Sequence, residues 1–282
     1  MKNGIVILNY NDSDNTSLIL EDIRNYKILD KIVIVDNKST DDSVKKLKHY
    51  ENKKIKILEA KENKGYAAGN NLGIEYLIKE GIENIVISNP DIIVSEEAIK
   101  LLIRDLERKD IDCVAPRIKE PKGISRGWKL PTFYSELVSN IPFFRRFEQK
   151  MLSYKEEDYQ GDLTSVDVVK GCFFIIKKEA IEDIHYFDEN TFLYYEEIIM
   201  AHKLKKKSYR TMVDNRVEVI HALSQSVDKS VSRIHKSKLL KASQYYYEKY
   251  VNHMNPIKLT IVRIFASLYL FGLQIERILR GK

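Results

Sequence analysis

Four carboxylate side chains stand at positions where they could act on a bound ligand. Asp36 and Asp91 each follow a short run rich in Ile and Val, whereas Glu196 and Glu197 are adjacent and follow an aromatic segment. Such runs are typical of strands buried on both faces of a parallel sheet, and ligands bind beyond the carboxyl ends of those strands. The sequence therefore indicates acidic chemistry at one edge of a sheet.

The two aspartates each have a ligand-binding and a structural interpretation. Asp36 could accept a hydrogen bond from the ring N–H of uracil or thymine or from ribose hydroxyls, or it could cap the following helix. Asp91, two phosphates and waters could complete the shell of Mg²⁺ or Mn²⁺, and the cation would neutralise charge on a departing diphosphate. Alternatively, Asp91 is a turn residue at a strand end.

The glutamate pair and one histidine offer further chemistry. A glutamate in an apolar setting has a raised pKa and can serve as a general base at neutral pH, which is one interpretation of Glu196 and Glu197. Two acidic residues at a helix start also simply offset the helix dipole. His221 ends a short strand predicted over 217–220, and could bind a metal, contact a phosphate or be structural.

A glycine-containing loop over residues 63–71, NKGYAAGNN, runs into a predicted helix. Gly65 and Gly69 would let the backbone approach a ligand closely, and amides at a helix start favour phosphate. The loop lacks the GxxxxGK[ST] pattern of a P-loop. Taken alone it is a weak indication of a phosphate site.

Strands and helices alternate through the first 110 residues. We expect strands at 4–8, 31–35, 55–58 and 84–88, and helices at 14–26, 41–50 (capped by Thr40 or Asp41), 69–80 and 95–108 (capped by Ser95). This alternation predicts a mainly parallel sheet with helices on both faces.

The second half is less regular. Glycines and prolines in 117–163 indicate that part of this stretch is a long, mobile loop; its Trp128 could stack on a sugar or lie in the core. A strand is expected over 166–177, interrupted at Gly171, followed by helices at 195–207, 230–250 and 256–280.

Composition and charge bound the class of protein. The 282 residues are 44% hydrophobic and 31% charged, as in a soluble globular domain. Cys113 and Cys172 lie far apart in apolar runs and read as buried hydrophobes, which fits a reducing compartment. The N-terminus lacks the features of a signal peptide, so we expect a cytoplasmic protein.

The net charge of +6 is unevenly distributed. Residues 203–282 hold 17 Lys and Arg against 5 Asp and Glu, a charge of +12, which leaves −6 for residues 1–202. The basic part could meet a membrane surface, a lipid phosphate or nucleic acid, or be a solvated face with no partner.

The order of the motifs is more specific than any one of them. They are NYN at 9–11, VDNKSTDDS at 35–43, NKGYAAGNN at 63–71, NPD at 89–91, APR at 115–117, VKGCFFIIKKEAI around Gly171, FDENTFLYYEE at 187–197 and IHALSQS around His221. This series resembles family 2 glycosyltransferases, in particular their rhamnosyltransferase-like branch, across roughly residues 3–226.

The resemblance implies a GT-A fold and an inverting, metal-dependent transferase. Residues 1–226 would form the catalytic domain, with a donor-binding half at 1–116 and an acceptor-side half at 117–226, and 227–282 a helical extension. A sugar, such as rhamnose, would pass from a UDP or dTDP donor to a glycan or lipid-linked acceptor in cell-surface polysaccharide synthesis. The implied residues are Asn9, Asn11, Asp36, Asn63, Gly65, Gly69, Asn70 and Asn89 for the donor, Asp91 and His221 for Mg²⁺ or Mn²⁺, Glu197 and Glu196 for catalysis, and Trp128, Gly171 and Asp188 on the acceptor side.

The sequence departs from the family pattern at the base. The usual pair there is Glu-Asp, with the aspartate as base, but here that position is Glu197, and a further acidic position is Ile199. One extra methylene moves a carboxylate by about 1 Å, a shift that can cost around 10²-fold in rate. A nucleotide-sugar-binding protein without catalysis is therefore an alternative; a nucleic-acid-binding protein is a remote one, since no zinc, RNP or helix-turn-helix signature is found.

The last expected helix, 256–280, is strongly apolar. Only twelve uncharged residues separate Arg263 from Glu276, short of the roughly 20 that span a membrane. With flanking cations it is predicted to lie at the inner membrane surface. The alternatives are packing on the domain or a homodimer interface.

Overall fold

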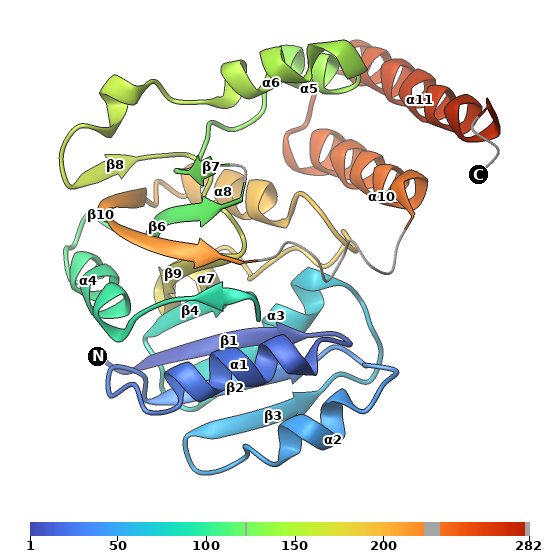
Figure 1. Ribbon diagram of the computed structural model, residues 1–282. Coiled ribbons are helices and arrows are strands. Elements are labelled where there is room, and N and C mark those ends of the chain that lie inside the picture. Colours follow the sequence, from blue (N-terminus) through green and yellow to red (C-terminus); the bar gives the residue numbers. More distant parts are fainter. Residues whose placement is uncertain (122, 223–231, 280–282) are drawn as a thin grey trace.

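The computed structural model describes residues 1–121, 123–222 and 232–279, and within these ranges ten strands form one sheet (Figure 1). The expected boundary between residues 226 and 227 and the expected helix start at 230 lie outside them. The strands are β1 (Asn3–Asn9), β2 (Lys31–Asp36), β3 (Ile55–Glu59), β4 (Asn84–Ser88), β5 (Ile92–Ile93), β6 (Cys113–Glu120), β7 (Gly123–Ser125), β8 (Leu163–Ser165), β9 (Phe173–Lys177) and β10 (Thr211–His221).

The first four strands pair in parallel in the order β3-β2-β1-β4. The chain runs outward from β1 to β3 and then crosses to β4 on the other side of β1. This reversal creates a switch point between the carboxyl ends of β1 and β4, where open α/β sheets bind ligands. Asn9 ends β1, and Asn89 follows β4 directly.

The rest of the sheet is mixed instead of parallel. β9 is antiparallel to both β4 and β6, and β10 runs parallel to β6. Of the single strand expected over 166–177, only β9 forms, and Gly171 lies in the connection between β8, which ends at Ser165, and β9. The expected α/β architecture is confirmed, with antiparallel pairing added in the second half.

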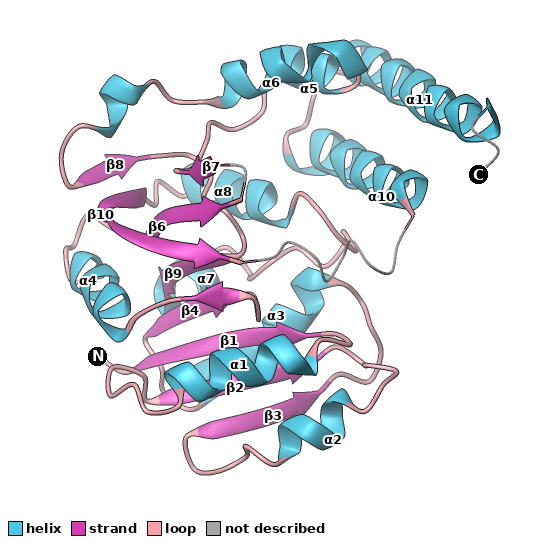
Figure 2. Ribbon diagram, viewed as in Figure 1, coloured by secondary structure: helices cyan, strands magenta, loops and turns pink. Residues whose placement is uncertain are grey.

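Helices cover both faces of the sheet, as expected (Figure 2). They are α1 (Ser13–Ile23), α2 (Ser43–Lys48) and α4 (Glu96–Leu106) on one face, and α3 (Tyr66–Lys79), α7 (Lys178–Asp183) and α8 (Glu196–Lys206) on the other. In β1, Ile5 and Ile7 face the first group and Val6 faces the second. Alternate residues of an apolar strand therefore join two separate cores.

Two of three local expectations about helix starts need correction. α2 begins at Ser43 and not beside Thr40 or Asp41, and the residue before it, Asp42, makes no side-chain cap. α3 begins at Tyr66, so Gly65 and not Gly69 stands at the helix start. The cap at Ser95 is confirmed, because its side chain accepts the N–H of Ala98.

The stretch 117–163 is more ordered than its glycines and prolines suggest. It contains β7, α5 (Phe133–Ser139) and α6 (Arg145–Leu152), with short 3₁₀ turns η1 (Pro142–Phe144) and η2 (Glu156–Tyr159). Thr132 caps α5 and exchanges hydrogen bonds with Ser135, which gives a short helix a defined start.

The C-terminal helices lie beside this stretch. They are α10 (Arg233–Tyr246), continued by the π-helical turn η3 (Tyr247–Val251), and α11 (Pro256–Leu279). α11 contacts both α10 and α5, and η3 contacts α8. In Figure 1 α5, α6, α10 and α11 form a layer at the end of the sheet away from β3.

Candidate active site

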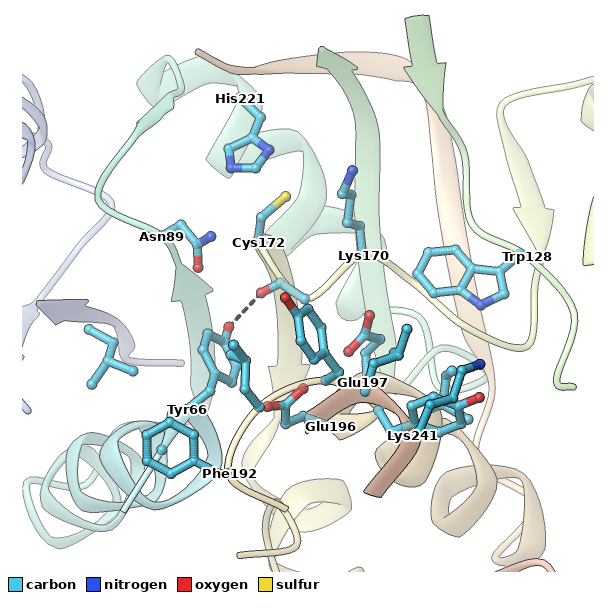
Figure 3. Close-up of a pocket in the computed structure, with 18 of the residues that line it drawn as sticks. Tyr66, Asn89, Trp128, Lys170, Cys172, Phe192, Glu196, Glu197, His221 and Lys241 are labelled. Carbon is cyan, nitrogen blue, oxygen red and sulfur yellow. Dashed lines mark hydrogen bonds between the residues drawn. The ribbon is translucent and has the colours of Figure 1, made fainter. Parts of the chain in front are cut away.

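A pocket of about 960 Å³ opens at the carboxyl ends of the parallel strands. Nine of the residues singled out from the sequence line it: Asn11, Asn63, Gly65, Asn89, Trp128, Gly171, Glu196, Glu197 and His221. Figure 3 shows the two glutamates at one side of this pocket, with Lys170, Cys172 and His221 toward the opposite side. Segments far apart in the sequence therefore meet at one cavity.

Asp36 is buried behind the wall of the pocket. Its carboxylate accepts the backbone N–H of Ser39 at 2.8 Å, the Ser39 hydroxyl at 2.6 Å and the Asn9 carboxamide at 2.8 Å. These bonds fix the turn after β2, so Asp36 orders a turn and does not cap α2. Neither Asn9 nor Asp36 is among the described residues that line the pocket. Contact of either residue with the sugar donor therefore stays a prediction.

Gly65 joins the loop over residues 63–71 to the segment before the glutamate pair. Its φ is +97°, and a Cβ atom there would stand 2.0 Å from the carbonyl oxygen of Phe192. That same oxygen accepts the N–H of Tyr66 at 3.1 Å, and the Tyr66 hydroxyl donates to the Gly171 carbonyl at 2.7 Å. Only glycine fits this approach, which holds three parts of the pocket together.

Gly69 and Asn70 have structural roles in α3. A Cβ at Gly69 would come within 2.4 Å of the Leu8 side chain, so the glycine lets α3 lie close to β1. The Asn70 carboxamide donates to the carbonyl of Tyr66. The described pocket lining includes neither residue, and their predicted donor contacts stay predictions.

Asp91 and His221 form a buried pair where β10 meets β5. The Asp91 Oδ1 atom lies 3.2 Å from His221 Nε2, which makes no aligned hydrogen bond within the described residues. On its other side His221 Nδ1 lies 2.9 Å from Glu120 Oε1. Burial lowers the pKa of His221, but Asp91 and Glu120 outweigh it and raise that pKa overall.

This pair fits part of a divalent metal site. A carboxylate oxygen and an imidazole nitrogen facing each other are suitable ligands for Mn²⁺ or Mg²⁺, and the Nδ1 contact with Glu120 would fix the ring. No group of three His, Cys, Asp or Glu able to hold a metal is found in the described part of the chain. The remaining ligands would have to come from donor phosphates and water.

Lys170 and Glu120 were missed by the sequence interpretation. Lys170 pairs with Glu120, which also holds His221, and Lys170 lines the pocket. Glu120 ends β6, Lys170 lies in the connection before β9, and no spacing in the sequence links them. A lysine directly before Gly171 in an otherwise apolar run was the one available signal.

Glu196 and Glu197 occupy the first turn of α8, next to the pocket. Burial first, and then the charge of Glu197, raises the pKa of Glu196 to about 8. Burial also raises the pKa of Glu197, while the positive charge of Lys170 opposes that rise. Because two adjacent carboxylates repel each other, ionisation of one opposes ionisation of the other.

Of the residues predicted for the acceptor side, Trp128 and Gly171 line the pocket and Asp188 does not. Trp128 is half-buried in the pocket wall, so it is neither a core residue nor fully exposed, and its backbone pairs with Val168. Asp188 accepts from the Tyr246 hydroxyl and lies 3.7 Å from the Lys203 ammonium. It anchors α10, and the described residues around the pocket do not include it. Ile199 is fully buried in the core.

The parallel switch point and the mixed sheet beside it are those of the GT-A fold. Residues 4–185 match the profile of Glycosyl transferase family 2, and the chain belongs to this family.

Relatives of known function are glycan-building enzymes. The chain is 26% identical over 276 residues to the low-salt glycan biosynthesis hexosyltransferase Agl10 of Haloferax volcanii, covering 98% of this chain and 78% of the relative. It is also 26% identical over 207 residues to poly-beta-1,6-N-acetyl-D-glucosamine synthase of Staphylococcus aureus, covering 71% of this chain but 45% of that enzyme. These matches do not single out the rhamnosyltransferase-like branch.

Solved structures share the fold at low sequence identity. The mannosyltransferase PcManGT from Pyrobaculum calidifontis, in complex with GDP-Man and Mn²⁺, superposes with a TM-score of 0.59 at 14% identity, covering 98% of this chain and 80% of that one. GalNAc-T7 with UDP, GalNAc and Mn²⁺ gives 0.62 at 14% identity, covering 99% and 57%. The expected GT-A fold is thereby confirmed.

Proposed function

We propose that this protein is a metal-dependent, inverting glycosyltransferase that moves a sugar from a UDP or dTDP donor to a glycan or lipid-linked glycan acceptor. The observation that carries the proposal is that Glu197 and His221 line one pocket beside the switch point of the sheet, with Asp91, outside the described lining, 3.2 Å behind His221. Nucleotide-sugar donors and Mn²⁺ in the structural neighbours support it. Rhamnose is one sugar to test among hexoses.

With one carboxylate as general base, the reaction is a single displacement of the diphosphate by the acceptor hydroxyl. Glu197 takes the proton of an acceptor hydroxyl as that oxygen attacks the anomeric carbon, and the bond from this carbon to the diphosphate breaks. Attack on the face opposite the leaving group inverts the configuration. Burial and the charge of Glu197 raise the pKa of Glu196, which disfavours a second negative charge beside the base. A divalent cation held by Asp91 and His221 would offset charge on the departing diphosphate.

The pocket offers separate regions for the two substrates. Asn11, Asn63 and Gly65 line the region near β1 and α3, where the donor is expected. Trp128, Lys241 and further residues of α6 and α10 line the opposite region, where the acceptor is expected. An indole face can stack on a sugar ring, which favours a glycan in that region.

Donor binding gives the most direct test of this function. With Mn²⁺ present, the true donor nucleotide raises the unfolding temperature in a thermal-shift screen of UDP-, dTDP- and GDP-sugars, because ligand binding stabilises the native state by mass action. At about 100 times the dissociation constant the stabilisation is about 2.7 kcal/mol. A response to a donor without transfer would favour the alternative of a binding protein that has lost catalysis; no response to any donor would contradict both.

The C-terminal helix supports a membrane-facing location. α11 is 24 residues long, with mean hydropathy 1.5 in its most apolar 18-residue window, enough in length and composition to cross a membrane. The count of uncharged residues therefore did not exclude a span. However, α11 packs on α5 and α10 through Val262, Tyr269 and Leu273. A helix that lies along its own domain favours docking at the inner membrane surface of a cytoplasmic enzyme.

We expect the protein to sediment with vesicles that contain anionic lipid, less so as salt rises. Ile264 and Phe271 are 53% and 59% exposed on α11, so I264E and F271E together abolish sedimentation without unfolding the domain. Leu18, 66% exposed on α1, supplies the control L18E, which sediments like the wild type. Equal loss with L18E, or no sedimentation of the wild type at low salt, would contradict membrane docking.

A further inference from the structure

The turn that carries the glutamate pair has an unusual backbone. Tyr194 and Tyr195, directly before α8, both have left-handed φ values, 73° and 71°. Bulky residues rarely adopt this conformation, and it persists only when surrounding contacts enforce it. The position of Glu196 and Glu197 therefore depends on whatever holds Tyr195.

Tyr195 is held from α5. Its hydroxyl lies 2.9 Å from both carboxylate oxygens of Glu136, and Gln244 of α10 donates to the same carboxylate. The Glu136 side chain is buried, and these donors compensate the cost of burying it. One carboxylate thus joins α5, α10 and the start of α8.

Other contacts from α10 hold the same loop. The Ser243 hydroxyl donates to the Leu193 carbonyl at 2.9 Å, and the Tyr246 hydroxyl donates to Asp188 at 3.1 Å. The Tyr195 ring also packs on Tyr247, with ring centres 5.6 Å apart. The layer of α5 and α10 therefore touches the catalytic turn at several points before α8.

We propose that Glu136 and Tyr195 are positioning residues, which fix the first turn of α8 so that Glu197 faces the acceptor hydroxyl. This inference rests on the proposed role of Glu197 as the base. Neither side chain takes a proton from substrate in this scheme. A carboxylate displaced by about 1 Å loses near-attack geometry, which can cost around 10²-fold in rate.

The test compares two tyrosine hydroxyls, one that holds the turn before α8 and one that contacts α8 itself. Y195F removes the bond to Glu136, whereas Y247F removes the 3.2 Å contact between the Tyr247 hydroxyl and His202 Nδ1, farther along α8. We expect Y195F to lower kcat by about 10- to 100-fold with an unchanged donor dissociation constant. Y247F should lower the unfolding temperature and keep kcat within about twofold of the wild type.

A second pair of variants tests the side-chain oxygen of Glu136 that accepts the hydrogen bond from Tyr195. The side-chain oxygen of E136Q can still accept the Tyr195 hydroxyl, but E136L, of similar size, cannot. We expect E136Q to keep more of kcat than E136L, a rescue that holds even if Y195F fails to fold. Equal kcat in E136Q and E136L, or a Y195F kcat within about twofold of the wild type, overturns the proposal.

A crystal structure of Y195F separates this inference from the proposed function. A Glu197 carboxylate displaced by about 1 Å supports positioning, and an unmoved carboxylate overturns it, whether or not the wild type transfers sugar. Absence of turnover by the wild type with every donor would instead contradict the proposed function.

Discussion

Replacing Glu197 by glutamine lowers kcat by about 10²–10⁴-fold and leaves donor affinity almost unchanged. Glutamine keeps the size of the side chain in the half-buried site but cannot take the proton of the acceptor hydroxyl. The donor is expected near β1 and α3, so its contacts survive. Initial rates at saturating substrates and a donor titration measure the two quantities separately.

The matched variants are E196Q and E197D. If E196Q loses kcat and E197Q does not, the base is Glu196 and the assignment of the pair must be exchanged. Retained or increased activity in E197D supports Glu197, because aspartate is the residue that the family resemblance implies at this position. Equal kcat in the wild type and E197Q contradicts a base at residue 197.

The pH profile follows from the direction of the shift. Burial raises the pKa of Glu197, so the base becomes protonated, and kcat falls, as pH decreases through a value above the usual glutamate range. We expect this acid limb in the wild type and its absence from the residual activity of E197Q.

The second large effect is expected at Asp91. D91A should lower turnover by at least about 10²–10³-fold, because a cation at a departing diphosphate supplies several kcal/mol of charge stabilisation. The same loss is expected when EDTA removes metal from the wild type. The assay is sugar transfer across a Mn²⁺ titration, with Mn²⁺ binding followed independently by calorimetry.

D91N controls for shape, since it keeps the side-chain volume and removes the charge that binds the cation. Thermal unfolding of D91A and D91N checks that the domain remains folded when the contact between Asp91 and His221 is lost. Full activity of D91A, or of the wild type in EDTA, contradicts the metal role.

Much of the sheet could be predicted because its strands are buried on both faces. The Ile- and Val-rich runs before Asn9, Asp36 and Asn89 mark the ends of β1, β2 and β4 to within a residue or two. Their side chains meet at one edge simply because parallel strands end together. Asn11 and Asn89 line the pocket because they follow β1 and β4, whereas Trp128, Gly171, Glu196 and Glu197 were expected there from the family resemblance.

The rest of the site could not be predicted, because its contacts join residues that are far apart in the sequence. Glu120 reaches His221 over 101 positions in the sequence, and Glu136 reaches Tyr195 over 59. No local pattern encodes such pairs. The helix α5 was missed for a different reason: glycine and proline near it suggested a loop, whereas the capping bonds of Thr132 define a short helix.

The contact between Gly65 and Phe192 also limits how this enzyme can be re-engineered. Because the backbone of residue 192 lies against a position that has no room for a Cβ atom, the donor loop and the turn before α8 form one matched unit. A chimera that imports residues 63–71 from a relative without residues 187–197 would bring mismatched surfaces together. Grafts intended to change the transferred sugar must therefore carry both segments, and these bring Glu197, the proposed general base, with them.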